Sequence, residues 1–175
     1  MKVAVAKYPI QAPESFDAFS GRLARLLDEA AGQGARVAVL PEYLSLELAA
    51  VFAADIRADL NASLAATQAL HADWMNLFAR LAGASRLHVV AGSFLLAVGE
   101  QRYRNRSYWF APDGTHGWQD KLQLTGFEKA TGVIEGGDAL KVFDVDGVRA
   151  GISVCYDSEL PLPVRAQYEA GARLL

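Results

Sequence analysis

The feature that most constrains the fold is an alternation of short apolar runs with amphipathic stretches. Val3–Val5 is one apolar run, and Val37–Leu40 is a second, closed by Pro41. Such runs predict strands, and the second is apolar on both faces, as expected for a buried strand. Between them, residues 16–30 place apolar side chains at helical spacing, with Ser15 as a predicted N-cap and with Gly32 and Gly34 marking the end of the helix. The chain therefore begins as strand, helix, strand.

The rest of the chain continues this alternation. Ala- and Leu-rich stretches and a proline-led segment predict helices over residues 44–54, 60–84 and 161–170. Apolar runs separated by turn residues predict two strand pairs, 87–98 with 102–111 and 140–145 with 148–154. Alternating strands and helices predict an α/β or α+β class with a layered sheet.

Composition limits the class of protein further. The chain has 175 residues, of which 52% are apolar and 21% are charged, which predicts one compact domain with a sizeable core. Seventeen basic and twenty acidic residues give a net charge of −3. No basic stripe is present that could neutralise a run of phosphates, so we expect no nucleic-acid partner. We also expect no cofactor and no metal, because there is no Walker loop and no histidine pair at metal-ligand spacing.

The same sequence predicts a soluble, cytoplasmic protein. A single cysteine cannot form an intrachain disulfide, which favours a reducing compartment. The first apolar run is too short and too interrupted for a signal peptide. The longest apolar stretch, residues 87–98, falls short of the roughly 20 residues that span a bilayer, so we expect no membrane partner.

One short pattern occurs twice. Residues 33–36 (Gln-Gly-Ala-Arg) leave the first predicted helix and enter a strand, and residues 170–173 (Ala-Gly-Ala-Arg) leave the last predicted helix and enter Leu174 and Leu175. A two-residue strand cannot form a useful ladder, because strands usually run about 5–6 residues. We therefore expect the chain to be truncated within a strand. The alternative is a natural C-terminus that frays.

Cys155 is the first candidate for chemistry, because it ends the apolar run Gly151–Val154. A side chain at the tip of a buried strand is held rigidly and can face a crevice. A lone cysteine is also a common small buried hydrophobe. As a nucleophile, a thiol with an ordinary pKa of about 8.5 needs a base or a cation beside it.

Glu42 is the stronger candidate for that base. Histidine, the usual partner, occurs within a helix pattern, within a strand pattern and after a turn, at His71, His88 and His116. These settings disfavour a Cys/His protease. Glu42 follows a buried strand, as Cys155 does, so in a sandwich both side chains would emerge at the same edge. Taken alone, this glutamate also fits an exposed turn.

Lys121 and Glu128 are two further candidates. The ammonium of Lys121 would lie in the same crevice, and the carboxylate of Glu128 would hold it there. The simpler interpretation of each is an ordinary solvated charge.

Three segments around these candidates agree in order and spacing with a known family. They are 39–43 (Val-Leu-Pro-Glu-Tyr), 119–128, which contains Gln-Asp-Lys-Leu and Thr-Gly-Phe-Glu, and 152–161 (Ile-Ser-Val-Cys-Tyr-Asp-Ser-Glu-Leu-Pro). Supporting matches lie at 91–93, Asn105, 112–114 and 137–138. Over essentially its whole length the chain resembles the carbon–nitrogen hydrolase (nitrilase) superfamily, most of all a bacterial branch sometimes fused to an acetyltransferase domain.

The resemblance implies an αββα sandwich in which residues 1–175 are the N-terminal portion of a carbon–nitrogen hydrolase domain, incomplete at the C-terminus. It implies a catalytic triad of Glu42, Lys121 and Cys155, with Glu128 as a fourth, positioning carboxylate and with no cofactor. Family domains continue past the cysteine with more strands and a helix, which this chain lacks. Activity of the 175-residue chain is therefore a separate question from activity of the family.

The implied reaction is hydrolysis of a non-peptide carbon–nitrogen bond in a small amide, or as a second choice a nitrile, through a cysteine thioester. Glu42 would be the base, and Lys121 with the backbone N–H of Tyr156 would face the oxyanion. The resemblance also implies a homo-oligomer of the full-length protein. Two alternatives remain: a catalytically inactive fragment or relative that acts only in binding or assembly, and an unrelated thiol enzyme. A thiol oxidoreductase is disfavoured because a second cysteine is missing.

Overall fold

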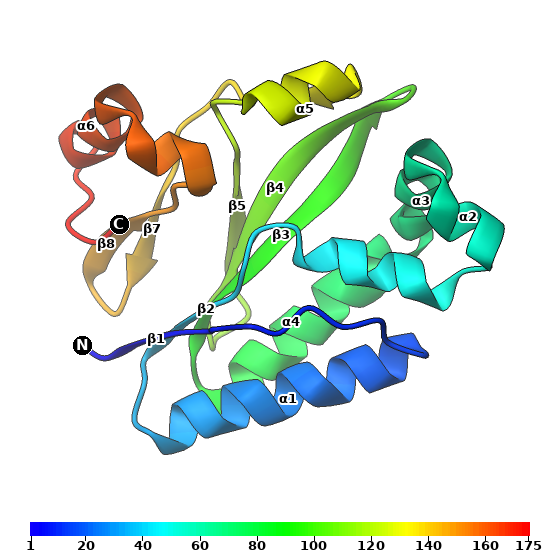
Figure 1. Ribbon diagram of the computed structural model, residues 1–175. Coiled ribbons are helices and arrows are strands. Elements are labelled where there is room, and N and C mark those ends of the chain that lie inside the picture. Colours follow the sequence, from blue (N-terminus) through cyan, green and yellow to red (C-terminus); the bar gives the residue numbers. More distant parts are fainter.

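A computed structural model describes all residues from 1 to 175 and contains two facing sheets (Figure 1). The larger sheet has six strands. Five of them lie side by side in chain order: β1 (Val3–Val5), β2 (Val37–Val39), β3 (His88–Gly99), β4 (Arg102–Phe110) and β5 (His116–Asp120). The sixth, β6 (Ile134–Glu135), pairs with β4. β1, β2 and β3 are parallel, whereas β4 runs antiparallel to β3 and β5. The smaller sheet is the hairpin of β7 (Val142–Val145) and β8 (Val148–Gly151).

Helices lie outside both sheets. α1 (Phe16–Gly32) and α4 (His71–Ser85) cover one face of the larger sheet, and α6 (Pro161–Glu169) lies beside the hairpin, away from α1 and α4 (Figure 1). This layering confirms the predicted αββα class. None of the helices combines the length and the apolar character needed to cross a membrane.

Two apolar clusters hold the layers together. The first has 19 buried residues between the helices and the larger sheet, and the side chains of Phe19, Trp74, Phe78 and Phe94 at its centre are 0% exposed. The second has six buried residues between the two sheets, where Trp109 packs against Phe143 of the hairpin. Each fully buried large apolar side chain stabilises the fold by about 1.5–3 kcal/mol.

Several local predictions are confirmed. Ser15 caps α1 by accepting a hydrogen bond from the backbone N–H of Ala18 at 3.1 Å. The long hairpin forms as β3 and β4, and the helix beginning at Pro161 forms as α6. These elements depend on short-range signals, namely a capping hydroxyl, a tight turn and a proline in the first helical turn.

The two helices predicted over 44–54 and 60–84 are each broken. The first consists of a 3₁₀ helix, η1 (Leu44–Val51), followed by α2 (Ala54–Ala58). The second consists of α3 (Leu60–Thr67), a 3₁₀ turn, η2 (Gln68–Leu70), and α4. At the second break the amide of Gln68 donates to the carbonyl of Leu95 at 2.9 Å and accepts from the N–H of Ala97 at 2.9 Å. The break thus docks the helical segment onto β3.

The strand predicted over 148–154 is too long. β8 ends at Gly151, because the next backbone groups bond to side chains instead of a neighbouring strand. Gln167 of α6 donates to the carbonyl of Ile152 at 2.8 Å, and the N–H of Val154 donates to Asp157 at 3.3 Å. Cys155 therefore opens a 3₁₀ helix, η3 (Cys155–Glu159), and does not end a strand.

The repeated Gly-Ala-Arg pattern has the same structure at both places. Gly34 and Gly171 both have positive φ, at 79° and 98°, and end α1 and α6. After them the N–H of Arg36 donates to the carbonyl of Lys2 at 2.8 Å, and the N–H of Arg173 donates to the carbonyl of Arg149 at 2.8 Å. Leu174 then bridges Ala150 in parallel, as β2 pairs with β1. The prediction that a strand begins at Leu174 agrees with this bridge.

Gly92 on β3 gives a direct test of how the fold places Glu42. A Cβ at this glycine would lie 2.3 Å from the carbonyl oxygen of Pro41, and φ is +65°. We expect Gly92→Ala to destabilise the protein by about 1–3 kcal/mol and to lower Tm by roughly 2–4 °C for each kcal/mol. The matched control is Gly32→Ala, where an added Cβ meets nothing within 4 Å. Thermal denaturation measures both, and equal Tm values for the two variants would contradict this packing.

Candidate active site

Lys121 is the centre of a buried charged cluster. It follows β5, and its side chain is 1% exposed. Its Nζ lies 2.8 Å from Oε1 of Glu42 and 2.9 Å from Oε2 of Glu128. Burial lowers the pKa of this lysine, but hydrogen bonds and charge from the two carboxylates outweigh burial and raise it overall. The ammonium therefore stays charged in the folded protein.

Glu42 is held by the loop that follows β2. The next residue, Tyr43, has φ 61°, and its backbone N–H donates to Oγ of Ser93 at 2.7 Å. Oε1 of Glu42 also accepts a hydrogen bond from Nδ2 of Asn105 at 2.7 Å. A left-handed non-glycine residue next to a reacting group is typical of functional sites, where the surroundings hold the backbone in place.

Glu128 is fixed by a short helix that was not predicted from the sequence, α5 (Gly126–Thr131). A capping box forms, in which the carboxylate of Glu128 accepts from the N–H and the Oγ1 of Thr125 at 2.8 and 2.9 Å. The phenol of Tyr43 also donates to Glu128. Burial alone would raise the pKa of this carboxyl, but the hydrogen bonds from Lys121, Tyr43 and Thr125 lower it to about 2. Glu128 is therefore a permanent counter-ion for Lys121.

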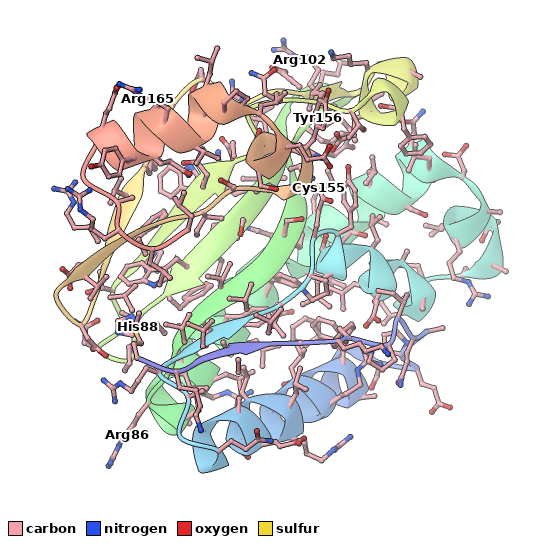
Figure 2. The ribbon with its side chains drawn as sticks, turned by 60° about the vertical axis from the view of Figure 1, so that its left-hand side comes forward. Arg86, His88, Arg102, Cys155, Tyr156 and Arg165 are labelled. Carbon is pink, nitrogen blue, oxygen red and sulfur yellow. The ribbon has the colours of Figure 1, made fainter.

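Cys155 lies across from this cluster, on the segment that follows the smaller sheet. It is exposed, has φ 49°, and shares with Glu42 a cavity of about 290 Å³ between the two sheets. In Figure 2 it lies with Tyr156 near one end of the larger sheet, whereas His88 lies near the other end. The histidine instead contacts Asp146 at 3.1 Å, at the turn between β7 and β8.

The thiol of Cys155 has a raised pKa. Loss of water around the sulfur is the first cause, and the negative charge of Glu42 is the second. The positive charge of Lys121 and the backbone N–H of Tyr156 act in the opposite direction. A raised pKa means that the resting group is a thiol and not a thiolate, so a base must take its proton before it can attack.

Two buried side chains for which the sequence predicted no role connect the Cys155 segment to the rest of the site. Asp157 is 2% exposed, and its carboxylate accepts from the backbone N–H groups of Leu122 and Gln123, at 3.1 and 2.7 Å, and of Val154. It thereby ties the loop after Lys121 to the segment before Cys155. Gln167 adds a second tie, because it bonds the same segment to α6.

The matching of the sequence to family models agrees with this geometry. The model for the carbon–nitrogen hydrolases matches residues 2–175, which is almost the whole chain. The chain belongs to the carbon–nitrogen hydrolase family. Family membership and the layered fold are thus established, and the resemblance seen in the sequence is confirmed.

Individual relatives cover the chain fully but are longer than it. A protein of Bacillus subtilis (strain 168), named "Probable hydrolase YhcX", is 28% identical over 177 residues, which is 100% of this chain and 33% of the relative. The crystal structure of a carbon–nitrogen hydrolase from Helicobacter pylori G27 superposes with a TM-score of 0.78 at 18% identity, over 98% of this chain and 57% of that one. The chain therefore spans about a third to a little over half of these relatives.

A third relative has a known ligand adduct. A mutant of the amidase from Nesterenkonia sp. AN1, with glutamine in place of a glutamate, shows the result of Michael addition of acrylamide at its active site cysteine. It superposes with a TM-score of 0.67 at 21% identity, over 99% of this chain and 65% of that one. At this identity the likeness shows a shared fold.

All four side chains singled out in the sequence lie in one region, around the cavity and the cluster behind it. Glu42, Lys121 and Glu128 are in direct contact, and Cys155 faces Glu42 across the cavity. Asn105 was noted only as part of the family pattern, yet it is 0% exposed and bonds to Glu42. The sequence signal for this contact was a polar residue in an otherwise strand-like run. The residues that Asn105 contacts cannot be found from that signal, because they lie far away in the sequence.

The charge of Glu128 gives a prediction about stability at low pH. Its pKa is about 2 when folded against an ordinary value of 4.5, so it contributes stability above about pH 4.5 that is lost as the pH falls toward 2. We expect Glu128→Gln to lower Tm at pH 7 and the difference from wild type to shrink between about pH 4.5 and 2. Glu100→Gln is the control, because this side chain is exposed, and its Tm at pH 7 should lie close to that of wild type. A gap for Glu128→Gln that stays constant down to pH 2 would contradict the assignment.

Proposed function

We propose that this chain carries the catalytic centre of an enzyme that hydrolyses the carbon–nitrogen bond of a small amide, or as a second choice a nitrile. The observation that carries the proposal is the shared cavity, in which the Cys155 thiol and the Glu42 carboxylate face each other in front of a buried ammonium. Family membership and the amidase among the structural relatives support it. The expected products are a carboxylic acid and ammonia or an amine.

In the first half of the reaction, Glu42 takes the proton of Cys155 as the sulfur attacks the amide carbonyl carbon. Negative charge then develops on the carbonyl oxygen. The backbone N–H of Tyr156 and the charge of Lys121, which both act on the sulfur, are the groups proposed to stabilise it. One such donor contributes about 2.7–4 kcal/mol in comparable sites.

In the second half, Glu42 gives the proton to the leaving nitrogen, the carbon–nitrogen bond breaks, and a thioester remains on Cys155. Glu42 is then a base again and activates a water molecule, which attacks the thioester carbonyl. The carbon–sulfur bond breaks, the acid leaves, and the thiol regains its proton. One amide and one water thus give one acid and one amine, with no redox step.

The predictions of a full-length homo-oligomer, of a cytoplasmic location and of residues 1–175 as the N-terminal portion of a longer domain stay predictions. The coverage of the relatives, at 33% and 57%, supports the last of them. For this reason the experiments below use the full-length protein.

The nucleophile is tested by Cys155→Ala. We expect this variant to release no ammonia from a panel of short aliphatic amides and to trap no acyl group, because the attacking sulfur is gone. Intact-mass spectrometry after rapid acid quench measures the acyl adduct, and circular dichroism checks that the variant folds. An acyl adduct on the alanine variant would refute the assignment.

The role of the ammonium is tested by Lys121→Met, which keeps an apolar stem and removes the charge. We expect kcat to fall about 10²–10³-fold, as when one oxyanion donor is lost. Lys129→Met is the control, because this lysine is exposed at the end of α5. Unchanged turnover in a folded Lys121→Met variant would remove Lys121 from the oxyanion role. If Lys121→Met fails to fold, Lys121→Gln also removes the charge and carries the same expectation.

A further inference from the structure

Asn105 has contacts that the proposed reaction does not yet use. It lies in the middle of β4, paired with Leu95 of β3, and is 0% exposed. Its Nδ2 lies 2.7 Å from Oε1 of Glu42 and 3.4 Å from Oε1 of Glu128. It lines neither of the two cavities that Glu42 borders. Asn105 therefore does not touch a substrate in those cavities and acts only through other residues.

The hydrogen bonds to Glu42 are unequal between its two oxygens. Oε1 accepts from Lys121 at 2.8 Å and from Asn105 at 2.7 Å, whereas neither of these two groups donates to Oε2. A carboxylate oxygen that already accepts two hydrogen bonds is a poor acceptor for a further proton, because its lone pairs are used. The available proton acceptor is Oε2.

We propose that Asn105 is a positioning residue that fixes the carboxylate plane of Glu42, so that Oε2 is the atom that takes the proton from Cys155 and returns it to the leaving nitrogen. This inference rests on the proposed function. With Lys121 as the only donor, the carboxylate could turn about its last bond and exchange its two oxygens. A second donor, approaching from β4, holds Oε1 in one place.

An asparagine amide suits this position for two reasons. Its NH₂ group donates to both carboxylates of the cluster without adding charge and without being able to take the proton itself. Its backbone is also rigid, because its carbonyl accepts from the N–H of Lys121 at 2.9 Å. The residue that orients the base and the residue that neutralises it are therefore linked through one strand contact.

The first test removes the donor with Asn105→Leu, a side chain of similar size. With propionamide as the probe, we expect kcat to fall about 10–100-fold, the effect of losing one hydrogen bond to a charged group. KM should change little, because Asn105 touches neither cavity. Asn76→Leu on α4, an exposed asparagine, is the matched control and should keep wild-type kcat. Asn105→Ala carries the same expectation where the leucine variant fails to fold.

The second test asks whether Asn105 acts through Glu42. Alkylation of Cys155 by iodoacetamide is measured for wild type, Asn105→Leu, Glu42→Gln and the double variant. We expect Asn105→Leu to slow alkylation in the wild-type background and to add nothing in the Glu42→Gln background, because the base is then absent. Equal effects in both backgrounds would overturn the proposal and indicate a general structural role.

The proposed function and the positioning role of Asn105 are contradicted by different outcomes. If wild type forms no thioester and releases no ammonia from any amide in the panel, the proposed function is wrong. If wild type turns over and a folded Asn105 variant retains its kcat, the proposed function stands and the positioning role of Asn105 is wrong.

Discussion

The site depends on one buried positive charge. An ammonium that is 1% exposed is costly unless carboxylates surround it, because burial removes its water. Lys121 meets this requirement with Glu42, from the loop after β2, and with Glu128, from α5. Three segments far apart in the chain are thereby brought to one point. Removing either carboxylate leaves the buried ammonium with a single counter-ion and one fewer hydrogen-bond acceptor, so the cluster is a structural requirement as well as a proposed catalytic one.

The proposed base and the proposed nucleophile belong to different parts of the sandwich. Glu42 follows a strand of the larger sheet, whereas Cys155 follows the smaller sheet. Their relative position therefore depends on contacts between the sheets, such as Trp109 against Phe143 with ring centroids 5.3 Å apart. Close to the site, Asp157 makes the shorter connection by bonding the loop after Lys121 to the turn that holds the thiol. The left-handed backbone conformation of Cys155 is therefore held by the hydrogen bonds of Asp157 and by the packing of the sheets, and not by a regular strand.

The elements that the sequence predicted well are those with local causes. The β3–β4 hairpin and the cap of α1 at Ser15 each depend on residues a few positions apart. The predictions failed where a distant partner decided the outcome. The helical segment breaks at Gln68 because its amide bonds to β3, and β8 stops at Gly151 because Gln167 of α6 takes the next carbonyl. Neither partner can be identified from the local pattern, since hydrophobic spacing carries no information about them.

The sequence by itself determined which residue types were available for chemistry. Three segments around Glu42, Lys121 and Cys155 identified the family, because the order and the spacing of polar residues after apolar runs can be read directly from a linear sequence. Only the tertiary structure decided which atoms meet. It placed Lys121 behind Glu42, gave Oε1 of that glutamate two donors, and assigned Asn105 and Asp157 to contacts 63 and 35 residues away. The physical reason is that a hydrogen bond depends on the distance and direction between two groups in space. For groups far apart in the sequence, both are fixed only when the sheets pack together.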